Sequence, residues 1–272
     1  MRPTNLAARA GRWSAQHRRI AILGWIAFVI AATVGGGMIG TNSLSDAEMG
    51  NGSSRAADMA IDRAGFRTVG GGVDLDKAER PLVVSVDGVR IGFVATDSIG
   101  ETPAATNDSP GTNRINAPPR TGPFDERALD RVAATVRELD ADVIIAVPHW
   151  GTQYTNVPER SQRRIARALV EAGADVVAGG HPHWVQGWEP MDEATVVHSL
   201  GNFVFDMDFM RETNEGIFLE IVSRGGRVVA VEPVPYVIDD RFTPRPARGA
   251  RAAAIFERIR ETSRPPFDAL RP

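Results

Sequence analysis

The middle of this chain holds two short apolar runs separated by one helical pattern. The run DVIIAVP, residues 142–148, reads as a buried strand, and DVVAG, residues 175–179, reads as another. Between them, Pro158 opens a helical pattern with an apolar stripe that ends at Gly173, where a helix terminus favours a left-handed residue. Two strands joined by one helix of this length lie parallel and are connected by a right-handed crossover. The pattern therefore predicts a βαβ unit and a domain of the α/β class.

The segments before this unit fit the same class. RPLVVSVDGVRIGFVATD holds two β-rich runs joined at Asp87-Gly88, so we expect a hairpin over residues 81–96. The stretch that follows, up to Pro123, is rich in Pro, Thr, Asn and Gly and is expected to be a long surface loop. A helical pattern begins at Phe124 and leads into the first buried strand.

Three histidines follow the two buried strands directly. The first strand ends in PHWG, at His149, and the second in GGHPHW, at His181 and His183. Because ligand sites of open α/β sheets form at the carboxyl ends of parallel strands, we expect these imidazoles to converge. The two glycines before His181 are expected to let the backbone turn closely, and the proline after it to fix the two rings relative to each other. Imidazole ligands suit zinc, manganese or iron better than magnesium or calcium.

Each histidine also has a plainer interpretation. A lone histidine after a buried strand is usually a hydrogen-bonded core or loop residue. His149 taken alone would be interpreted in this way, whereas the three histidines together favour a metal site. His198, in ATVVHSLGNF, is expected to be such a satisfied strand residue, and His17 lies in a basic flank. For the polar residues of SLGNFVFDMDF we expect turn roles or contacts behind the site rather than ligation; they are Asn202, Asp206 and Asp208.

Composition limits the classes of partner. The 272 residues are 43% hydrophobic and 24% charged, enough for a real core. A net charge of -3 with scattered basic residues argues against nucleic acid as a partner. The chain has no cysteine, so disulfides, thiolate metal sites and cysteine nucleophiles are excluded.

The N-terminal region predicts a membrane location. Residues 20–40 carry no charge and approach the roughly 20 residues that cross a bilayer as a helix, so we expect one transmembrane anchor there. Residues 1–19 form a basic flank with Arg2, Arg9, Arg12, Arg18 and Arg19. This bias predicts a single-pass cell-membrane protein with a cytoplasmic N-terminus and an extracytoplasmic C-terminal domain. The alternatives are a cleaved signal peptide and a buried core helix.

Part of this region resembles a transporter. RWSAQHRRIAILGW and GTNSLSDAEMGNGSSRAADMAIDRAGF resemble the start of an MMPL-type (RND-like) lipid transporter, over about residues 8–66. Residues 41–66 would then be an MMPL-like linker. Such transporters need many spans, and one helix cannot enclose a polar pathway, so transport by this chain is not expected.

The rest of the chain resembles another family. PHWGTQYTNVPERSQRRIARALVEAGADVVAGGHPHWVQGWE followed by VVHSLGNFVFD looks like the C-terminal half of the CapA family of bacterial capsule and poly-γ-glutamate synthesis proteins. The similarity covers about residues 67–240, and residues 241–272 form an Arg/Pro-rich tail with a short helix. The resemblance implies a calcineurin-like metallophosphoesterase fold, an α/β sandwich. It also implies that His149, His181 and His183 help hold metal ions for phosphoester hydrolysis.

The chain departs from that family in its metal motifs. The early Gly-Asp, Asn-x-Glu and Asn-Asn-His motifs of the family are absent, so we expect a partial domain that holds at most one divalent ion, manganese, zinc or iron. The catalytic residues stay unassigned. Two functions remain open. One is a membrane-anchored CapA-type protein of capsule or poly-γ-glutamate synthesis with an incomplete hydrolase site. The other is a non-enzymatic remnant or binding module, formed by fusion of the start of an MMPL-type transporter to the end of a CapA-type protein. Expected partners are the membrane, a polyanionic capsule polymer and other capsule-synthesis membrane proteins.

Overall fold

The chain divides into two units, residues 1–44 and 45–272, and the computed structural model describes residues 13–14, 16–39, 65–265 and 267. The first unit contains helix α2, Arg18–Ile39. Among the described residues, no helix has both the length and the apolar character needed to cross a membrane. The stretch 20–39 is thus helical, but the transmembrane span expected over 20–40 is not supported. Most of the basic flank and residues 41–64 of the predicted linker lie outside the described residues.

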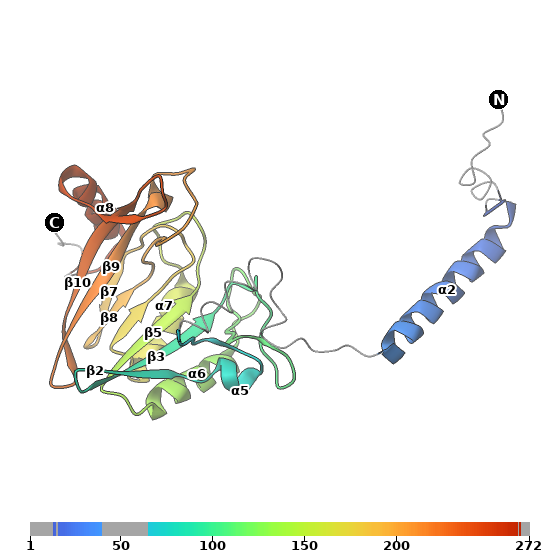
Figure 1. Cartoon of the computed structure of the whole chain (residues 1–272), viewed down its shortest axis with the longest axis horizontal. Coiled ribbons are helices and arrows are strands. Elements are labelled where there is room, and N and C mark those ends of the chain that lie inside the picture. The colour runs from blue at the N-terminus through green and yellow to red at the C-terminus, as the bar shows by residue number, and fades with distance from the viewer. Residues whose placement is uncertain (1–12, 15, 40–64, 266, 268–272) are drawn as a thin grey trace. The chain divides into compact units, whose positions relative to one another are not determined.

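Six strands form the central sheet of the second unit, in the order β2-β3-β5-β6-β8-β7 (Figure 1). Their bounds are β2 Leu82–Val86, β3 Val89–Asp97, β5 Val143–His149, β6 Val176–Ala178, β7 Trp188–Met191 and β8 Ala194–Val197. Strands β3, β5, β6 and β8 are parallel, and the outer strands β2 and β7 are antiparallel to their neighbours. Helix α7, Arg160–Glu171, connects β5 to β6, so the predicted βαβ unit is confirmed.

The hairpin at the start of this sheet is also confirmed. Val86 pairs with Val89 across the turn, and both turn residues have left-handed backbone, with φ +50° at Asp87 and +82° at Gly88. Two left-handed residues match the right-handed twist of the flanking strands, and Asp and Gly tolerate that conformation best. The local sequence therefore sets the register of β2 on β3.

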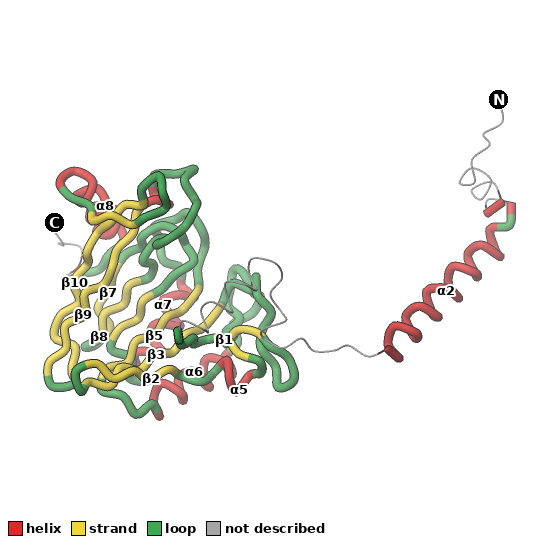
Figure 2. The backbone as a smooth tube through the Cα atoms, in the orientation of Figure 1, coloured by secondary structure: helices red, strands yellow, loops and turns green. Residues whose placement is uncertain are grey.

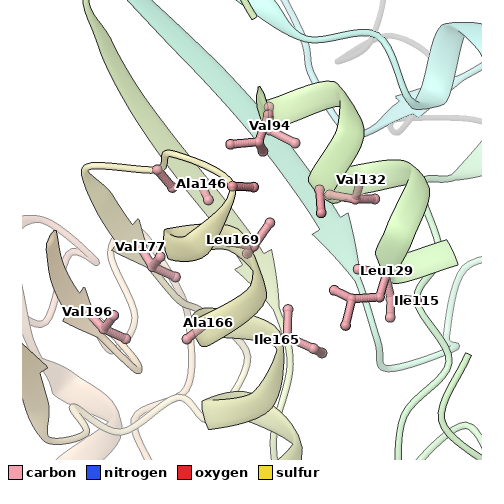
Figure 3. Close-up of a cluster of buried hydrophobic side chains, with 14 of the residues drawn as sticks. Val94, Ile115, Leu129, Val132, Ala146, Ile165, Ala166, Leu169, Val177 and Val196 are labelled. Atoms are coloured by element: carbon pink, nitrogen blue, oxygen red, sulfur yellow. The ribbon is translucent and has the colours of Figure 1, made fainter. Parts of the chain in front are cut away.

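Two helices cover one face of the central sheet. Helix α6, Glu126–Glu138, begins where the Asp125 carboxylate accepts a hydrogen bond from the Ala128 N–H at 3.0 Å. It packs beside α7 on a row of side chains that crosses four parallel strands (Figure 3). That row is Val94, Ala146, Val177 and Val196. Each large aliphatic side chain buried here contributes about 1.5–3 kcal/mol, so this layer fixes the carboxyl edge of the sheet in place.

A second sheet covers the opposite face. It has the order β11-β10-β9, with β9 Glu215–Arg224, β10 Arg227–Ile238 and β11 Pro244–Pro246 (Figure 2). Leu219 and Ile221 of β9 pack against Val143, Ile145 and Val176 of the central sheet. The second unit is therefore a layered α/β sandwich, as expected.

The remaining elements are short or lie at the end of the chain. They are β1 Gly71–Gly72, α5 Leu75–Ala78, β4 Gly111–Thr112, the 3-10 helix η1 Glu212–Asn214 and α8 Gly249–Thr262. The segment between β3 and α6 is largely loop, as predicted, although β4 pairs with β1 inside it. Helix α8 lies in the tail where we expected a short helix, and it buries Ile255, Phe256 and Ile259.

Candidate functional site

Parallel pairing brings the three predicted histidines to one edge of the central sheet. His149 is the last residue of β5, and an isolated bridge to Gly180 extends the pairing beyond β6. The rings of His149 and His181 have centroids 4.8 Å apart, with His181 Nδ1 3.2 Å from His149 Nε2. The ring of His183 lies 5.8 Å from that of His181. The three imidazoles therefore form one cluster, the histidine cluster, as expected from the strand order.

The glycine before this cluster is required by close packing. A Cβ on Gly179 would lie 2.2 Å from the His198 carbonyl oxygen and 2.4 Å from Trp150 Nε1. The next residue, Gly180, has room, because the nearest atom to its added Cβ is His149 Nδ1 at 4.0 Å. The expectation that both glycines allow a close backbone approach is therefore right for Gly179 and wrong for Gly180.

The turn itself is made by the histidines. The backbone φ is +94° at His181 and +62° at His183, on either side of Pro182. Left-handed backbone costs a residue with a Cβ roughly 1–2 kcal/mol. Strained backbone of this kind is concentrated at binding and catalytic sites, where surrounding contacts enforce it.

His183 is oriented by its neighbours. Its Nδ1 lies 2.7 Å from Asn202 Oδ1, so Nδ1 carries the proton and Nε2 carries the lone pair, which the Gln153 amide nitrogen approaches to 3.5 Å. Asn202 is itself fixed, because its amide nitrogen donates to the Thr213 carbonyl at 3.0 Å. Tyr154 stacks on one side of the ring at 5.8 Å, and Phe205 lies 5.6 Å away. Asn202 thus acts behind the site, as predicted.

Burial keeps two of the histidines neutral. It lowers the pKa of His181 to about 4, with the neighbouring His149 and His183 acting in the same direction and Asp97 opposing. Burial also lowers the pKa of His149, although Asp97 opposes it here too. A neutral imidazole has a lone pair free for a metal ion or a proton.

The donor set suits a divalent ion, although the rings are not arranged around one. His181 Nε2 is buried and has no hydrogen-bond partner among the described residues, which leaves a polar atom unsatisfied. Within the described ranges, no group of three His, Asp or Glu side chains is placed to hold one metal ion. The 3.2 Å contact between His149 Nε2 and His181 Nδ1 occupies one nitrogen of each ring, so in this arrangement those two nitrogens are not both available to an ion.

Asp97, at the end of β3, lies opposite His149 in the sheet register. Its carboxylate pairs with Arg114 at 2.9 Å and accepts hydrogen bonds from Thr112 at 3.0 Å and the Ile99 N–H at 2.8 Å. Asp97 and His149 also line a cavity of about 260 Å³ with Glu101. Because Asp97 already has three partners, it is a weak candidate for a bridging ligand.

His198 has a structural role, but the expectation of a satisfied strand residue holds only in part: the residue follows β8, and its Nδ1 is buried with no hydrogen-bond partner among the described residues. His198 is buried, and its Nε2 lies 2.6 Å from Glu189 Oε1. Glu189 also pairs with Arg163 at 3.3 Å and Arg264 at 2.9 Å. Burial lowers the pKa of His198, so the ring is neutral and its Nε2–H donates a hydrogen bond to the Glu189 carboxylate.

The structure shows no contact between the histidine cluster and the two carboxylates after Asn202 within residues 65–265. These two residues, Asp206 and Asp208, are exposed.

A buried polar network under the site was not predicted. Trp150 Nε1 donates to the His198 carbonyl at 2.8 Å, and Gln162 Nε2 donates to Gln186 Oε1 at 2.9 Å. Gln186 in turn donates to the Thr155 carbonyl at 3.0 Å. The sequence does carry a signal for this network: Gln162 is three residues before Ile165 and therefore lies on the apolar stripe of α7. A polar residue in that position indicates a buried hydrogen bond.

The sequence matches a family model over most of this domain. Residues 49–207 match the family described as bacterial capsule synthesis protein PGA_cap. The chain belongs to this family. The match begins inside the segment 41–66 that resembles a transporter, and the transporter resemblance stays a prediction.

Curated relatives agree with this assignment. A capsule biosynthesis protein CapA of Bacillus anthracis is 29% identical over 194 residues, which are 70% of this chain and 45% of the relative. A PGA biosynthesis protein CapA of Bacillus subtilis is 31% identical over 160 residues, 58% of this chain and 40% of the relative. A probable polyglutamine synthesis accessory protein of Mycobacterium tuberculosis is 31% identical over 55% of this chain and 40% of its own length. The chain thus spans less than half the length of these relatives.

Similarity to solved structures is weaker. A hypothetical protein from Thermus thermophilus has a TM-score of 0.39 at 16% identity, covering 58% of this chain and 61% of the other. A phosphatase from Mycoplasma pneumoniae has a TM-score of 0.38 at 12% identity, covering 61% and 60%. At these scores the two structures add nothing to the fold described above.

Proposed function

We propose that this chain is a CapA-type protein of capsule or poly-γ-glutamate synthesis whose histidine cluster binds one divalent metal ion. The observation that supports this most is the convergence of His149, His181 and His183 at the carboxyl edge of a parallel sheet, with His181 Nε2 buried and unsatisfied. Manganese, zinc or iron suits imidazole donors. A bound ion would polarise a phosphoryl oxygen and lower the pKa of its water ligand.

The chain's own residues supply orientation. Asn202 holds the tautomer of His183 in which Nε2 can coordinate, as partners behind metal ligands commonly do. The left-handed backbone on both sides of Pro182 directs His181 and His183 to the same edge. The burial that keeps His181 neutral leaves its lone pair available.

We further propose that hydrolysis by this chain alone is weak. A two-metal phosphoesterase needs carboxylates to bridge its ions, and Asp97 is committed to Arg114 and to two hydrogen bonds. The family's Gly-Asp, Asn-x-Glu and Asn-Asn-His motifs are also absent from the sequence. The same observations favour a second candidate function, a binding module without catalysis.

Metal content tests the first part of this proposal. The full chain, loaded with manganese or zinc and desalted, should retain about one equivalent per chain. His181→Ala should lose it, while His17→Ala, in the basic flank, should keep it. Retention of metal by a folded His181→Ala variant would contradict the ligand assignment.

Turnover of a chromogenic phosphoester separates the two candidate functions. We expect near-background hydrolysis with added manganese, because the second metal site is not built. Hydrolysis well above background that is abolished by His183→Ala would refute the incomplete-site proposal. Asp97, Asp206 and Asp208 would then be the first carboxylates to replace.

We also propose that α2 attaches the chain to the cell membrane, with the N-terminus in the cytoplasm and the α/β domain outside. Five arginines precede the uncharged stretch, and within its own unit α2 leaves large apolar side chains uncovered, among them Leu23, Trp25 and Phe28. A reporter fused after Pro272 should be active only outside the cytoplasm. Cytoplasmic activity of the reporter would refute this topology.

A further inference from the structure

Helix α7 is unusually basic for this chain. Its twelve residues, RSQRRIARALVE, carry four arginines and one glutamate, whereas the whole chain has a net charge of -3. Its first turn holds no acidic residue and begins with Arg160, although the N-cap is Glu159. Positive side chains at a helix N-terminus oppose the helix dipole and do not stabilise the helix. By contrast, α6 begins with acidic residues at its cap and in its first turn.

The basic end of α7 lines a groove of the α/β domain. The groove has a volume of about 800 Å³, and its apolar lining includes Pro118, Pro119 and Val157, while Glu159 supplies one carboxylate. Three arginines of α7 lie along it, at positions 160, 163 and 164. The lining thus combines apolar side chains with three arginines and one glutamate, and the Glu159 carboxylate already accepts hydrogen bonds from the Thr152 and Ser161 hydroxyls.

The three arginines differ in how far they are engaged. Arg163 is structural, because it pairs with buried Glu189 and donates to the Pro158 carbonyl at 2.8 Å. Arg164 covers the Phe124 ring at 4.2 Å, and it pairs with an exposed glutamate of α6. Arg160 is exposed and makes no ion pair or hydrogen bond within the described residues. Arg160 is therefore free to bind an anion, and Arg164 can exchange a solvent-exposed partner for one.

We propose that this groove binds a polycarboxylate chain, the chemistry of a glutamate polymer. The inference rests on the proposed role in capsule or poly-γ-glutamate synthesis and adds the place where the polymer lies. Guanidinium groups bind carboxylates in a bidentate fork, and the apolar lining residues suit the methylene groups between the carboxylates. Nucleic acid fits less well, because the one aromatic ring of the lining, Phe124, is already covered by Arg164.

One loop runs between the groove and the histidine cluster. The segment from Trp150 to Pro158 leaves the cluster after His149 and ends at the groove. Gln153 Nε2 lies 3.5 Å from His183 Nε2, and the Thr152 hydroxyl donates to the Glu159 carboxylate. A polymer held in the groove would therefore lie at the same end of the βαβ unit as the cluster.

Binding of a labelled glutamate oligomer to the full chain tests this proposal, measured by fluorescence anisotropy at low salt. Arg160→Ala should weaken binding several-fold, and the double variant Arg160→Ala/Arg164→Ala roughly tenfold or more. Arg167→Ala is the matched control, because Arg167 is exposed on the same helix but does not line the groove, and it should bind as the native chain does. Added salt should weaken binding, since exposed charges are screened.

Other outcomes separate this site from the metal site. His181→Ala should leave oligomer binding unchanged even if it abolishes metal binding, so either proposal can fail without the other. Absence of oligomer binding to the native chain, or an equal loss in Arg167→Ala, would overturn the groove assignment. Tighter binding of a single-stranded DNA oligomer that is lost in Arg160→Ala would show that the groove serves nucleic acid instead.

Discussion

Replacing Gly179 with alanine should destabilise the α/β domain far more than the same change one residue later. The added Cβ would lie 2.2 Å from the His198 carbonyl oxygen and 2.4 Å from Trp150 Nε1, well inside van der Waals contact. Both atoms are backed by packed structure, and they are joined to each other by a 2.8 Å hydrogen bond. The chain must therefore shift at this point, and the shift separates the indole from its acceptor.

The expected magnitude follows from these two effects. Overpacking of a well-packed core costs about 1–3 kcal/mol, and leaving a buried donor and acceptor unpaired costs about 1–3 kcal/mol more. The free energy of unfolding should fall by about 2–6 kcal/mol in Gly179→Ala. In a unit of this size, such a loss lowers the thermal midpoint by at least about 4 °C.

The neighbouring glycine provides the control. In Gly180→Ala the nearest atom to the new Cβ is 4.0 Å away, so this variant should unfold within about 0.5 kcal/mol of the native chain. Urea unfolding, monitored by tryptophan fluorescence, gives the free energy of unfolding of both variants, and Trp150 contributes to the fluorescence signal. Equal stabilities of the two alanine variants would refute the packing argument at Gly179.

Three further predictions concern the groups that brace the site. Burial lowers the pKa of His198, so below about pH 6.5 this histidine is protonated in the unfolded chain and neutral in the folded chain. The free energy of unfolding, measured by urea titration, should therefore decline as pH falls below about 6.5. A stability that rises between pH 7 and 5 would contradict this assignment of His198. Although burial opposes it, the hydrogen bond from His198 and two arginines lower the pKa of Glu189, so its contribution should be lost only below about pH 4.5; a stability that does not fall there would contradict the assignment of Glu189. Tyr236→Phe removes the donor to the buried Asn202 carbonyl and should cost about 1–3 kcal/mol in the same assay, whereas an unchanged midpoint would show that the carbonyl finds another partner. Arg264→Ala removes one of two arginines from the buried Glu189 and should destabilise the chain measurably, while Arg241→Ala, exposed in a turn, should not.

The parts of the fold that the sequence predicted are those set by local rules. The hairpin at Asp87-Gly88 follows from turn chemistry, and the βαβ unit follows from two apolar runs at fixed distance from one amphipathic helix. Leu219 and Ile221 of the second sheet pack against Val143 of the central sheet, and this contact joins segments more than seventy residues apart in the sequence. No local pattern encodes which face a distant sheet will cover, so the second layer of the sandwich followed from family resemblance alone.

The histidine cluster was predictable for a similar reason, and its detail was not. Parallel strands end at one edge, which places His149 and His181 together whatever the loops do. The conformation of the GGHPHW turn depends on what packs around it, and the crowding that Trp150 imposes on Gly179 is invisible in the sequence. The engagement of Asp97 by Arg114 also depends on a loop whose course has no periodic signal.

The left-handed backbone at His181 and His183 has a consequence for how this chain would change under selection. Glycine at either position would relieve roughly 1–2 kcal/mol of backbone strain, and asparagine part of it, so selection for heat resistance alone should drive both histidines out. Selection that also requires a bound metal ion should keep them and place its stabilising changes elsewhere. The positions that laboratory evolution preserves in the two regimes would therefore reveal what these residues do without a substrate being known.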